Sequence, residues 1–167
     1  PRLAIAEGFH YIDLADAPDF VAAIGVLDEA AREANVLIVS GASSVPALSA
    51  AVLDEYREQF AELQHIDIGI SPGNRAERGL ATVRSILSGV GKPHVQFEHA
   101  APVLRAGWSG LRRHRYPAPI GQRWLAFCPV PDPVILPDRY PHLQTFHFRA
   151  GVELRRMHFG IWLGGLL

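Results

Sequence analysis

Cysteine is almost absent from this chain of 167 residues, which carries a single one, Cys128. A disulfide framework within the chain is therefore excluded, and the composition favours a reducing compartment, so we expect a cytoplasmic protein. No apolar run approaches the roughly 20 residues of a membrane-spanning helix, and we expect no membrane partner. The formal net charge is only −1, which gives no reason to expect binding to nucleic acid.

Several catalytic signatures are also missing. No G-x-G-x-x-G follows a predicted strand, so these residues lack the fingerprint that holds the pyrophosphate of a dinucleotide. No serine lies in a G-x-S-x-G elbow, and Cys128 is expected to be a buried, inert thiol in a strand, so a hydrolase is not supported. The eight histidines include no H-x-x-x-H pair, and we expect no metal site.

The chain does carry the composition of a globular protein, with 49% hydrophobic and 20% charged residues. Its first part alternates between strand and helix. Residues 9–14 and 36–39 are predicted strands, and the helix between them has Pro18 in its first turn. This is the pattern of a parallel βαβ unit. A second helix is predicted after Gly41, with Ser43 and Ser44 as its N-caps.

Beyond residue 60 the strands follow one another with short connections and few crossover helices, which is typical of an α+β arrangement. We therefore predict a fold that passes from α/β to α+β, with a mixed, largely antiparallel sheet covered by helices. Residues 100–119 contain glycine, proline and a basic run and are predicted to form a loop. The predicted domain boundary lies within the helix at residues 45–60.

Several segments, in order, resemble the saccharopine dehydrogenase-like oxidoreductases and their bacterial relatives. They are YIDLAD (11–16), VLIVSGASSVPALS (36–49), GISPGNRAERGLATVRSIL (69–87), GW (107–108) and AGVELRRMHFGIW (150–162). In that family a dinucleotide-binding domain precedes a mixed-sheet substrate domain. The resemblance implies that residues 1–48 are the C-terminal part of a Rossmann-like dinucleotide-binding domain. Residues 49–167 would then form an α+β substrate or dimerisation domain.

The resemblance also implies a parent protein that uses NAD or NADP on an amino-acid-like or other small carboxylate substrate. Because the phosphate fingerprint is missing, we expect this chain to be a fragment that binds no cofactor and is inactive alone. The opening residues agree with this expectation. They include no initiator methionine, and they are typical of the last turns of a helix with Gly8 just past its end.

By resemblance, Ser43, Ser44, Val45 and Pro46 form the loop beside the nicotinamide, although helix capping alone also accounts for the serines. Asn74, Arg75 and Arg78 precede a predicted helix. Two guanidiniums and a helix N-terminus are suited to a carboxylate or a phosphate, and we expect these residues to bind the substrate. The alternative is a solvated basic loop in which the arginines pair with Glu77.

The run of residues 112–115, Arg-Arg-His-Arg, can anchor an acidic substrate or form a solvated turn. The sequence does not choose an acid/base residue among His99, His114, Tyr11 and Asp13. A non-catalytic binding or dimerisation module that retains the fold remains the alternative function. In either case we expect a homo-oligomer, because the apolar strands at 9–14 and 36–39 would leave an unpaired sheet edge.

Overall fold

The structure, a computed structural model, describes residues 1–77 and 79–166. The chain divides into two compact units. The first unit is Pro1–Leu63 with Val130–Pro141, and the second is Gln64–Pro129 with His142–Leu167. The domain limits expected from the sequence, 1–48 and 49–167, stay a prediction. Among the described residues, no helix combines the length and apolar character needed to cross a membrane.

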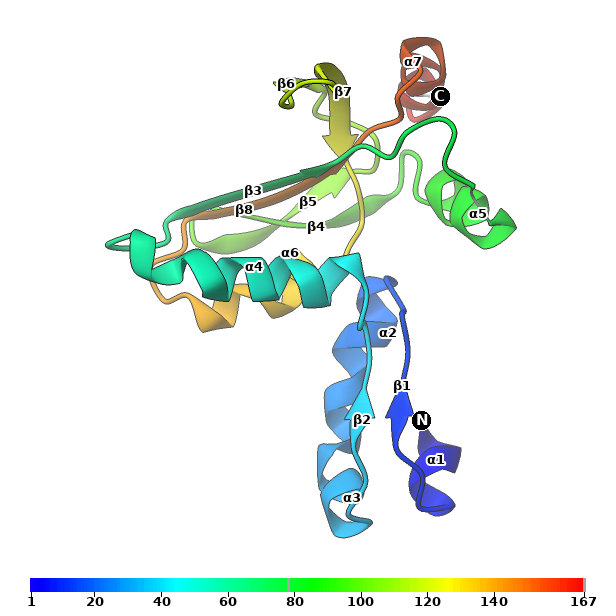
Figure 1. Ribbon diagram of the computed structural model, residues 1–167, viewed down its shortest axis with the longest axis vertical. Coiled ribbons are helices and arrows are strands. Elements are labelled where there is room, and N and C mark those ends of the chain that lie inside the picture. The colour runs from blue at the N-terminus through cyan, green and yellow to red at the C-terminus, as the bar shows by residue number, and fades with distance from the viewer. Residues whose placement is uncertain (78, 167) are drawn as a thin grey trace. The chain divides into compact units, whose positions relative to one another are not determined.

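The first unit contains short helices and two short strands (Figure 1). In chain order they are α1 (Arg2–Ala6), β1 (Tyr11–Ile12), α2 (Pro18–Ala22), η1 (Ala23–Leu27), α3 (Asp28–Glu33), β2 (Ile38–Val39), η2 (Ser44–Leu48), α4 (Ser49–Tyr56), η3 (Arg57–Gln59), α6 (Asp132–Ile135) and η4 (Pro137–Arg139).

Strands β1 and β2 pair in parallel, with Tyr11 opposite Ile38, which confirms the predicted βαβ order. Both strands are shorter than predicted. The helix between them is also less regular, because the 3₁₀ turn η1 separates α2 from α3. Gly8 and Asn35 follow helix ends with φ of 72° and 53°, the left-handed conformation that closes a helix and that these two residue types adopt at least cost.

The second unit is built on a six-stranded sheet. Its elements are β3 (His65–Ile70), α5 (Leu80–Ser88), β4 (Pro93–Glu98), β5 (Ala101–Ala106), β6 (Arg112–Arg115), β7 (Gln122–Phe127), β8 (Thr145–Ala150) and α7 (Arg155–Gly164). The strand order is β5-β4-β8-β7-β6, and β3 joins β8 in parallel while the other pairs are antiparallel. The predicted mixed, largely antiparallel sheet is confirmed.

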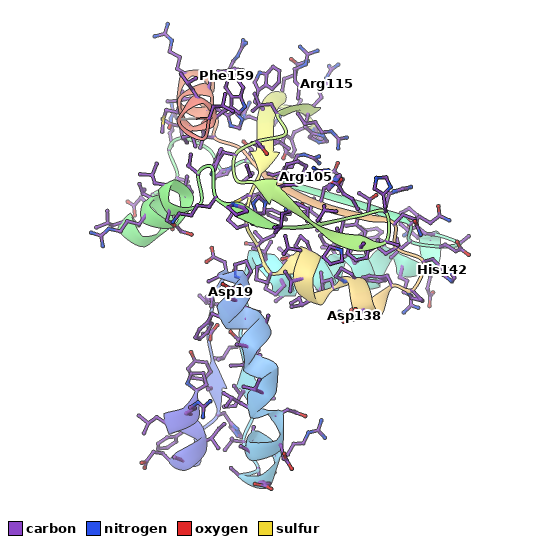
Figure 2. All side chains as sticks on the ribbon, turned by 180° about the vertical axis from the view of Figure 1, so that it is seen from behind. Asp19, Arg105, Arg115, Asp138, His142 and Phe159 are labelled. Carbon is purple, nitrogen blue, oxygen red and sulfur yellow. The ribbon has the colours of Figure 1, made fainter. Side chains whose placement is uncertain are left out.

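Register gives this sheet two distinct faces. On β8, Phe146 and Phe148 are fully buried on one face, and His147 and Arg149 alternate with them onto the other. Apolar packing continues at the helices, where Trp108, Ala126 and Val152 form a core with side chains from α5 and α7. Figure 2 labels Phe159 on α7. Its ring packs edge-to-face against Trp124 of β7, with ring centroids 5.3 Å apart.

The predicted loop at 100–119 is wrong, because β5 and β6 both lie within it. Strand β5 pairs with β4 over six residue pairs. The turn between them is His99-Ala100, and both residues have positive φ. A two-residue hairpin turn of this kind normally carries Asn-Gly or Asp-Gly, so the sequence gives no turn signal here. Strand β6 is polar throughout and exposed, and it therefore shows none of the alternation that predicts a strand.

Candidate functional site

Asp13, one of the acid/base candidates, holds two loops of the first unit together. Its carboxylate accepts hydrogen bonds from the backbone N–H groups of Ala15 at 2.9 Å and Gly41 at 3.0 Å, and from the Ser40 hydroxyl at 2.9 Å. Burial by itself raises the pKa of Asp13, but these hydrogen bonds outweigh it and lower the pKa to about 2. The pKa of Tyr11 is raised by its hydrogen bond to the same carboxylate. The acceptor positions of Asp13 are thus used to join the loops that follow β1 and β2.

The Ser43–Pro46 loop does not begin a regular helix. Val45 is extended, at φ −136° and ψ 126°, and α4 starts only at Ser49. The predicted capping role is wrong for Ser43, whose hydroxyl instead donates to the Val45 carbonyl oxygen at 3.4 Å. Ser44 is exposed, whereas Val45 and Pro46 are buried. Of these four residues, Ser44 is thus exposed and Ser43 is half-buried.

A buried carboxyl anchors the start of α4 within the first unit. Asp132 is fully buried, and one of its oxygens is hydrogen bonded to the Ser49 hydroxyl. That hydroxyl also lies 2.9 Å from the Pro46 carbonyl oxygen, which can only accept. A serine hydroxyl has one proton to donate, so if it donates to Pro46 it must accept from Asp132. Burial raises the pKa of Asp132 against the opposing effect of its hydrogen bond with Ser49, a direction that favours the neutral carboxyl.

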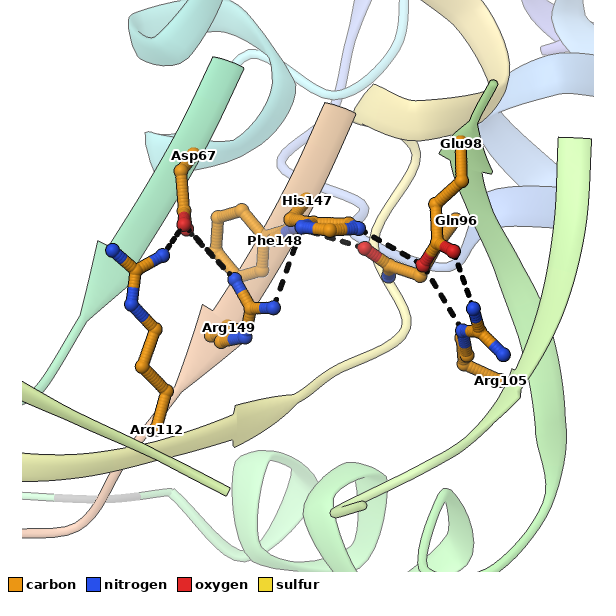
Figure 3. Close-up of polar contacts among 8 residues, drawn as sticks. All are labelled: Asp67, Gln96, Glu98, Arg105, Arg112, His147, Phe148 and Arg149. Atoms are coloured by element: carbon orange, nitrogen blue, oxygen red, sulfur yellow. Dashed lines mark hydrogen bonds and ion pairs between the residues drawn. The ribbon is translucent and has the colours of Figure 1, made fainter. Parts of the chain in front are cut away.

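A cluster of charged side chains lies on the face of the second unit's sheet that carries His147 and Arg149, the face opposite Phe146 and Phe148. Figure 3 shows its contacts. We call it the charged face network. Its six members follow one another in a chain of contacts: Arg112, Asp67, Arg149, His147, Glu98 and Arg105. They come from β6, β3, β8, β4 and β5. Three guanidiniums face two carboxylates in this network, so it carries a net positive charge when His147 is neutral.

Arg149 is the most firmly held member of the network. Its side chain is 9% exposed and donates to both Asp67 oxygens, at 2.9 and 3.0 Å. Its guanidinium also lies 4.3 Å from the ring centroid of Phe127, a favourable cation–π geometry. Burial and the nearby charge of Arg112 lower the pKa of Arg149. Arg112 reaches the same Asp67 carboxylate from β6, so two guanidiniums converge on one carboxylate.

His147 connects the two charged ends of the network. Its Nδ1 lies 3.3 Å from the Arg149 guanidinium and its Nε2 lies 2.9 Å from Glu98 Oε1. Arginine can only donate, so Nδ1 accepts and the ring proton sits on Nε2, where it is donated to Glu98. Burial lowers the pKa of His147 against the opposing effect of Glu98. The hydrogen bond from Arg105, which outweighs burial, lowers the pKa of Glu98 to about 2.

The remaining sequence candidates lie outside this network. His99 is exposed in the β4–β5 turn. His114 is exposed on β6 and packs edge-to-face against Tyr116, with ring centroids 4.5 Å apart. Arg75 is exposed, and the backbone N–H of Asn74 donates to the Glu153 carboxylate. Arg78 lies outside the described residues.

Two further expectations are corrected. The basic run at residues 112–115 is neither a loop nor wholly solvated, because Arg112 pairs with Asp67. Cys128 follows β7 and is half-buried rather than buried. Over the described ranges, the side chains of His, Cys, Asp and Glu form no group of three that could hold a metal ion.

Sequence reasoning did not find His147, Arg149, Asp67, Glu98 or Arg105. The contact from Arg149 to Asp67 spans 82 residues of sequence, and the contact from His147 to Glu98 spans 49. The sequence signal for a polar sheet face was the alternation of polar and apolar residues on β8, β3 and β4, as in Thr145, His147 and Arg149 against Phe146 and Phe148. Neither protein-family models nor curated proteins gave a match to this chain when searched.

Proposed function

We propose that the chain is the substrate-binding part of a cytoplasmic, NAD- or NADP-dependent oxidoreductase that acts on an amino-acid-like or other small carboxylate. The proposal rests on the ordered family resemblance and on one observation in the structure. Arg149 and Arg112 both contact the single carboxylate of Asp67 on a partly exposed sheet face. Paired guanidiniums are the preferred partners of carboxylates in proteins, so this geometry supports a carboxylate substrate.

The cofactor part of the proposal concerns the Ser43–Pro46 loop. The hydroxyls of Ser43 and Ser44 fit the role of hydrogen bonding to a nicotinamide carboxamide, and Val45 and Pro46, both buried, would hold the loop from behind. The nicotinamide would supply the hydride chemistry. The protein's contribution would be to orient the ring and the substrate. The phosphate-binding fingerprint is absent from this chain, so the chain alone is expected not to bind dinucleotide.

A binding experiment tests the carboxylate site. Glutarate is titrated calorimetrically into the chain and into Arg112→Gln. The substitution should weaken binding about tenfold, at the low end for loss of a charge-assisted hydrogen bond because Arg112 is half-exposed. Arg113→Gln is the matched control, because Arg113 neighbours Arg112 but pairs with Trp124, which lies on the other face of the sheet. Arg75→Gln, in the same series, tests the site predicted from the sequence.

The outcomes separate the possible sites. Equal weakening by Arg112→Gln and Arg113→Gln would indicate only general electrostatic attraction. Weakening by Arg75→Gln alone would place the carboxylate at the Asn74 loop. Oxidoreductase activity is tested in a protein extended to include a dinucleotide-binding loop, by following NADH and NADPH absorbance with carboxylate substrates. Absence of turnover with an intact loop would contradict the enzymatic proposal.

A second candidate is a non-catalytic binding or dimerisation module. One observation favours it. Each carboxylate of the charged face network already has a partner within the chain, Asp67 with two arginines and Glu98 with Arg105 and His147. A network whose charges are already paired within the chain can have a purely structural role, in which it holds the strands of the sheet together. A folded, stable chain that binds none of the carboxylates tested would support this second candidate.

A further inference from the structure

The two arginines that contact Asp67 are held very differently. Arg149 is nine-tenths buried and is fixed by Asp67, by His147 and by the ring of Phe127. Arg112 has a side chain that is 52% exposed and a single described ion pair, to Asp67. One guanidinium is therefore part of a rigid sheet face, and the other is a long side chain on an exposed strand.

Asp67 itself is only partly enclosed, with 37% of its side chain exposed. Its carboxylate serves both arginines, but the contact with Arg149 is the more sheltered of the two. Ion pairs between exposed groups contribute only about 0.2–1 kcal/mol, so exchange of Arg112 from one carboxylate to another costs little. The Nε of Arg149 is buried without a hydrogen bond partner, so the buried guanidinium still has an unused donor.

We propose that Asp67 is an internal carboxylate that occupies Arg112 until the carboxylate of a small organic acid replaces it. The inference rests on the proposed function, since it concerns how the same site takes its substrate. In the resting chain, Asp67 neutralises both guanidiniums. When the acid binds, Arg112 turns to the incoming carboxylate and Asp67 stays with Arg149. Asp67 thus competes with the ligand and sets its affinity.

The test is a double-mutant cycle between Asp67 and Arg112, with glutarate as the probe and calorimetry as the readout. Asp67→Asn keeps an oxygen that can accept from Arg149 but removes the competing charge. Binding should therefore tighten by up to about fivefold, which corresponds to the upper end for one exposed ion pair. In the Arg112→Gln background the same substitution should give no gain, because no guanidinium is left to be released.

Two results would overturn the inference. Unchanged or weaker binding by a folded Asp67→Asn variant would show that Asp67 supports the site instead of competing for it. An equal gain with and without Arg112 would reduce the effect to general electrostatics. If wild type binds glutarate and Arg112→Gln weakens it, the proposed function survives either result. If neither wild type nor Asp67→Asn binds the probe, both proposals fail.

A second measurement does not depend on the folding of Asp67→Asn. The carboxylate ¹³C resonance of Asp67 is followed by NMR in wild type and in Arg112→Gln as glutarate is added. Loss of its partner Arg112 should shift the resonance in wild type, at the same ligand concentration that saturates the calorimetric signal. In Arg112→Gln the resonance should not move. A wild-type resonance that stays in place through saturation would contradict the exchange.

Discussion

At the scale of single residues, two carboxyl groups of the chain have pKa values that are shifted in opposite directions. Glu98, hydrogen bonded by Arg105, has its pKa lowered to about 2. Asp132, fully buried beside Ser49, has its pKa raised by burial. Glu98 is therefore held in the charged form, and Asp132 is held toward the neutral one. Neither environment is visible in the sequence: Asp132 depends on Ser49, 83 residues away, and Glu98 meets Arg105 only because the unpredicted β4–β5 hairpin brings the two side chains together.

Asp132 gives a prediction for the pH dependence of stability. Its pKa is raised above the ordinary value of 3.8, so the folded state binds this proton more tightly than the unfolded state. The resulting stabilisation is complete below about pH 3.8 and is lost as the pH rises through the folded pKa. Asp132→Asn, which stays neutral and can still donate to Ser49, should remove this loss and be at least as stable as wild type at pH 7.

Denaturant unfolding between pH 3 and pH 8 measures the effect. The difference in free energy of unfolding between Asp132→Asn and wild type should grow with pH. Asp138→Asn is the control, since Asp138 is an exposed acid a few residues away. Asp132→Ala removes the donor altogether and should cost about 1–3 kcal/mol. A pH profile of Asp132→Asn parallel to that of wild type would mean that Asp132 titrates normally.

At the scale of elements, the sequence predicted the helices and strands that carry a periodic pattern of apolar residues within their own segment. The βαβ order of the first unit and the helix α5 follow from local apolar spacing and from turn residues such as Gly8. Strands β5 and β6 were missed because pairing with β4 and β7, and not their own pattern, makes them strands. The charged face network was missed for the same reason, because it exists only once β3, β4 and β8 are side by side.

Two glycines of the second unit should respond in opposite ways to alanine. A Cβ added at Gly160 in α7 meets no atom within 4 Å, whereas one added at Gly107 would lie 2.0 Å from the Gly89 carbonyl oxygen. Gly160→Ala should therefore stabilise the chain by about 0.5–1 kcal/mol through helix propensity. Gly107→Ala should destabilise it by roughly 1–3 kcal/mol because backbone must move.

Thermal and denaturant unfolding of the two variants checks this contrast. Both variants carry the same change, glycine to alanine, so a difference between them reflects the position and not the chemistry of the substitution. Destabilisation by Gly160→Ala would show that α7 needs the glycine for close packing. If Gly107→Ala leaves the free energy of unfolding unchanged, the backbone at residues 89 and 107 has more room than the 2.0 Å approach indicates.

At the scale of the whole molecule, self-association is expected from the surface of the first unit. Strands β1 and β2 form a sheet of only two strands, and such a pair is marginal without further strands or packing. Around it, Phe9, Ile12 and Leu37 are 66%, 69% and 62% exposed. Unpaired strand edges beside exposed apolar side chains favour pairing between chains.

Sedimentation velocity over a concentration series measures this association. The chain should form dimers or larger species as its concentration rises, and Ile12→Lys on β1 should weaken them, because an edge lysine opposes strand pairing. Val26→Lys is the control, since Val26 is 76% exposed but belongs to the helical turn η1 and not to either strand. A strict monomer at all concentrations, or equal effects of the two lysines, would contradict association through β1 and β2.

The division of the chain has a consequence for synthesis on the ribosome. The first unit takes its last residues from Val130–Pro141, after the chain has passed through much of the second unit. Ser49 and its buried partner Asp132 are 83 residues apart. At about 5–20 residues per second, Ser49 emerges several seconds before Asp132 exists. During that interval the nascent first unit is open and exposes its apolar interior, and this is the window in which chaperones would bind it.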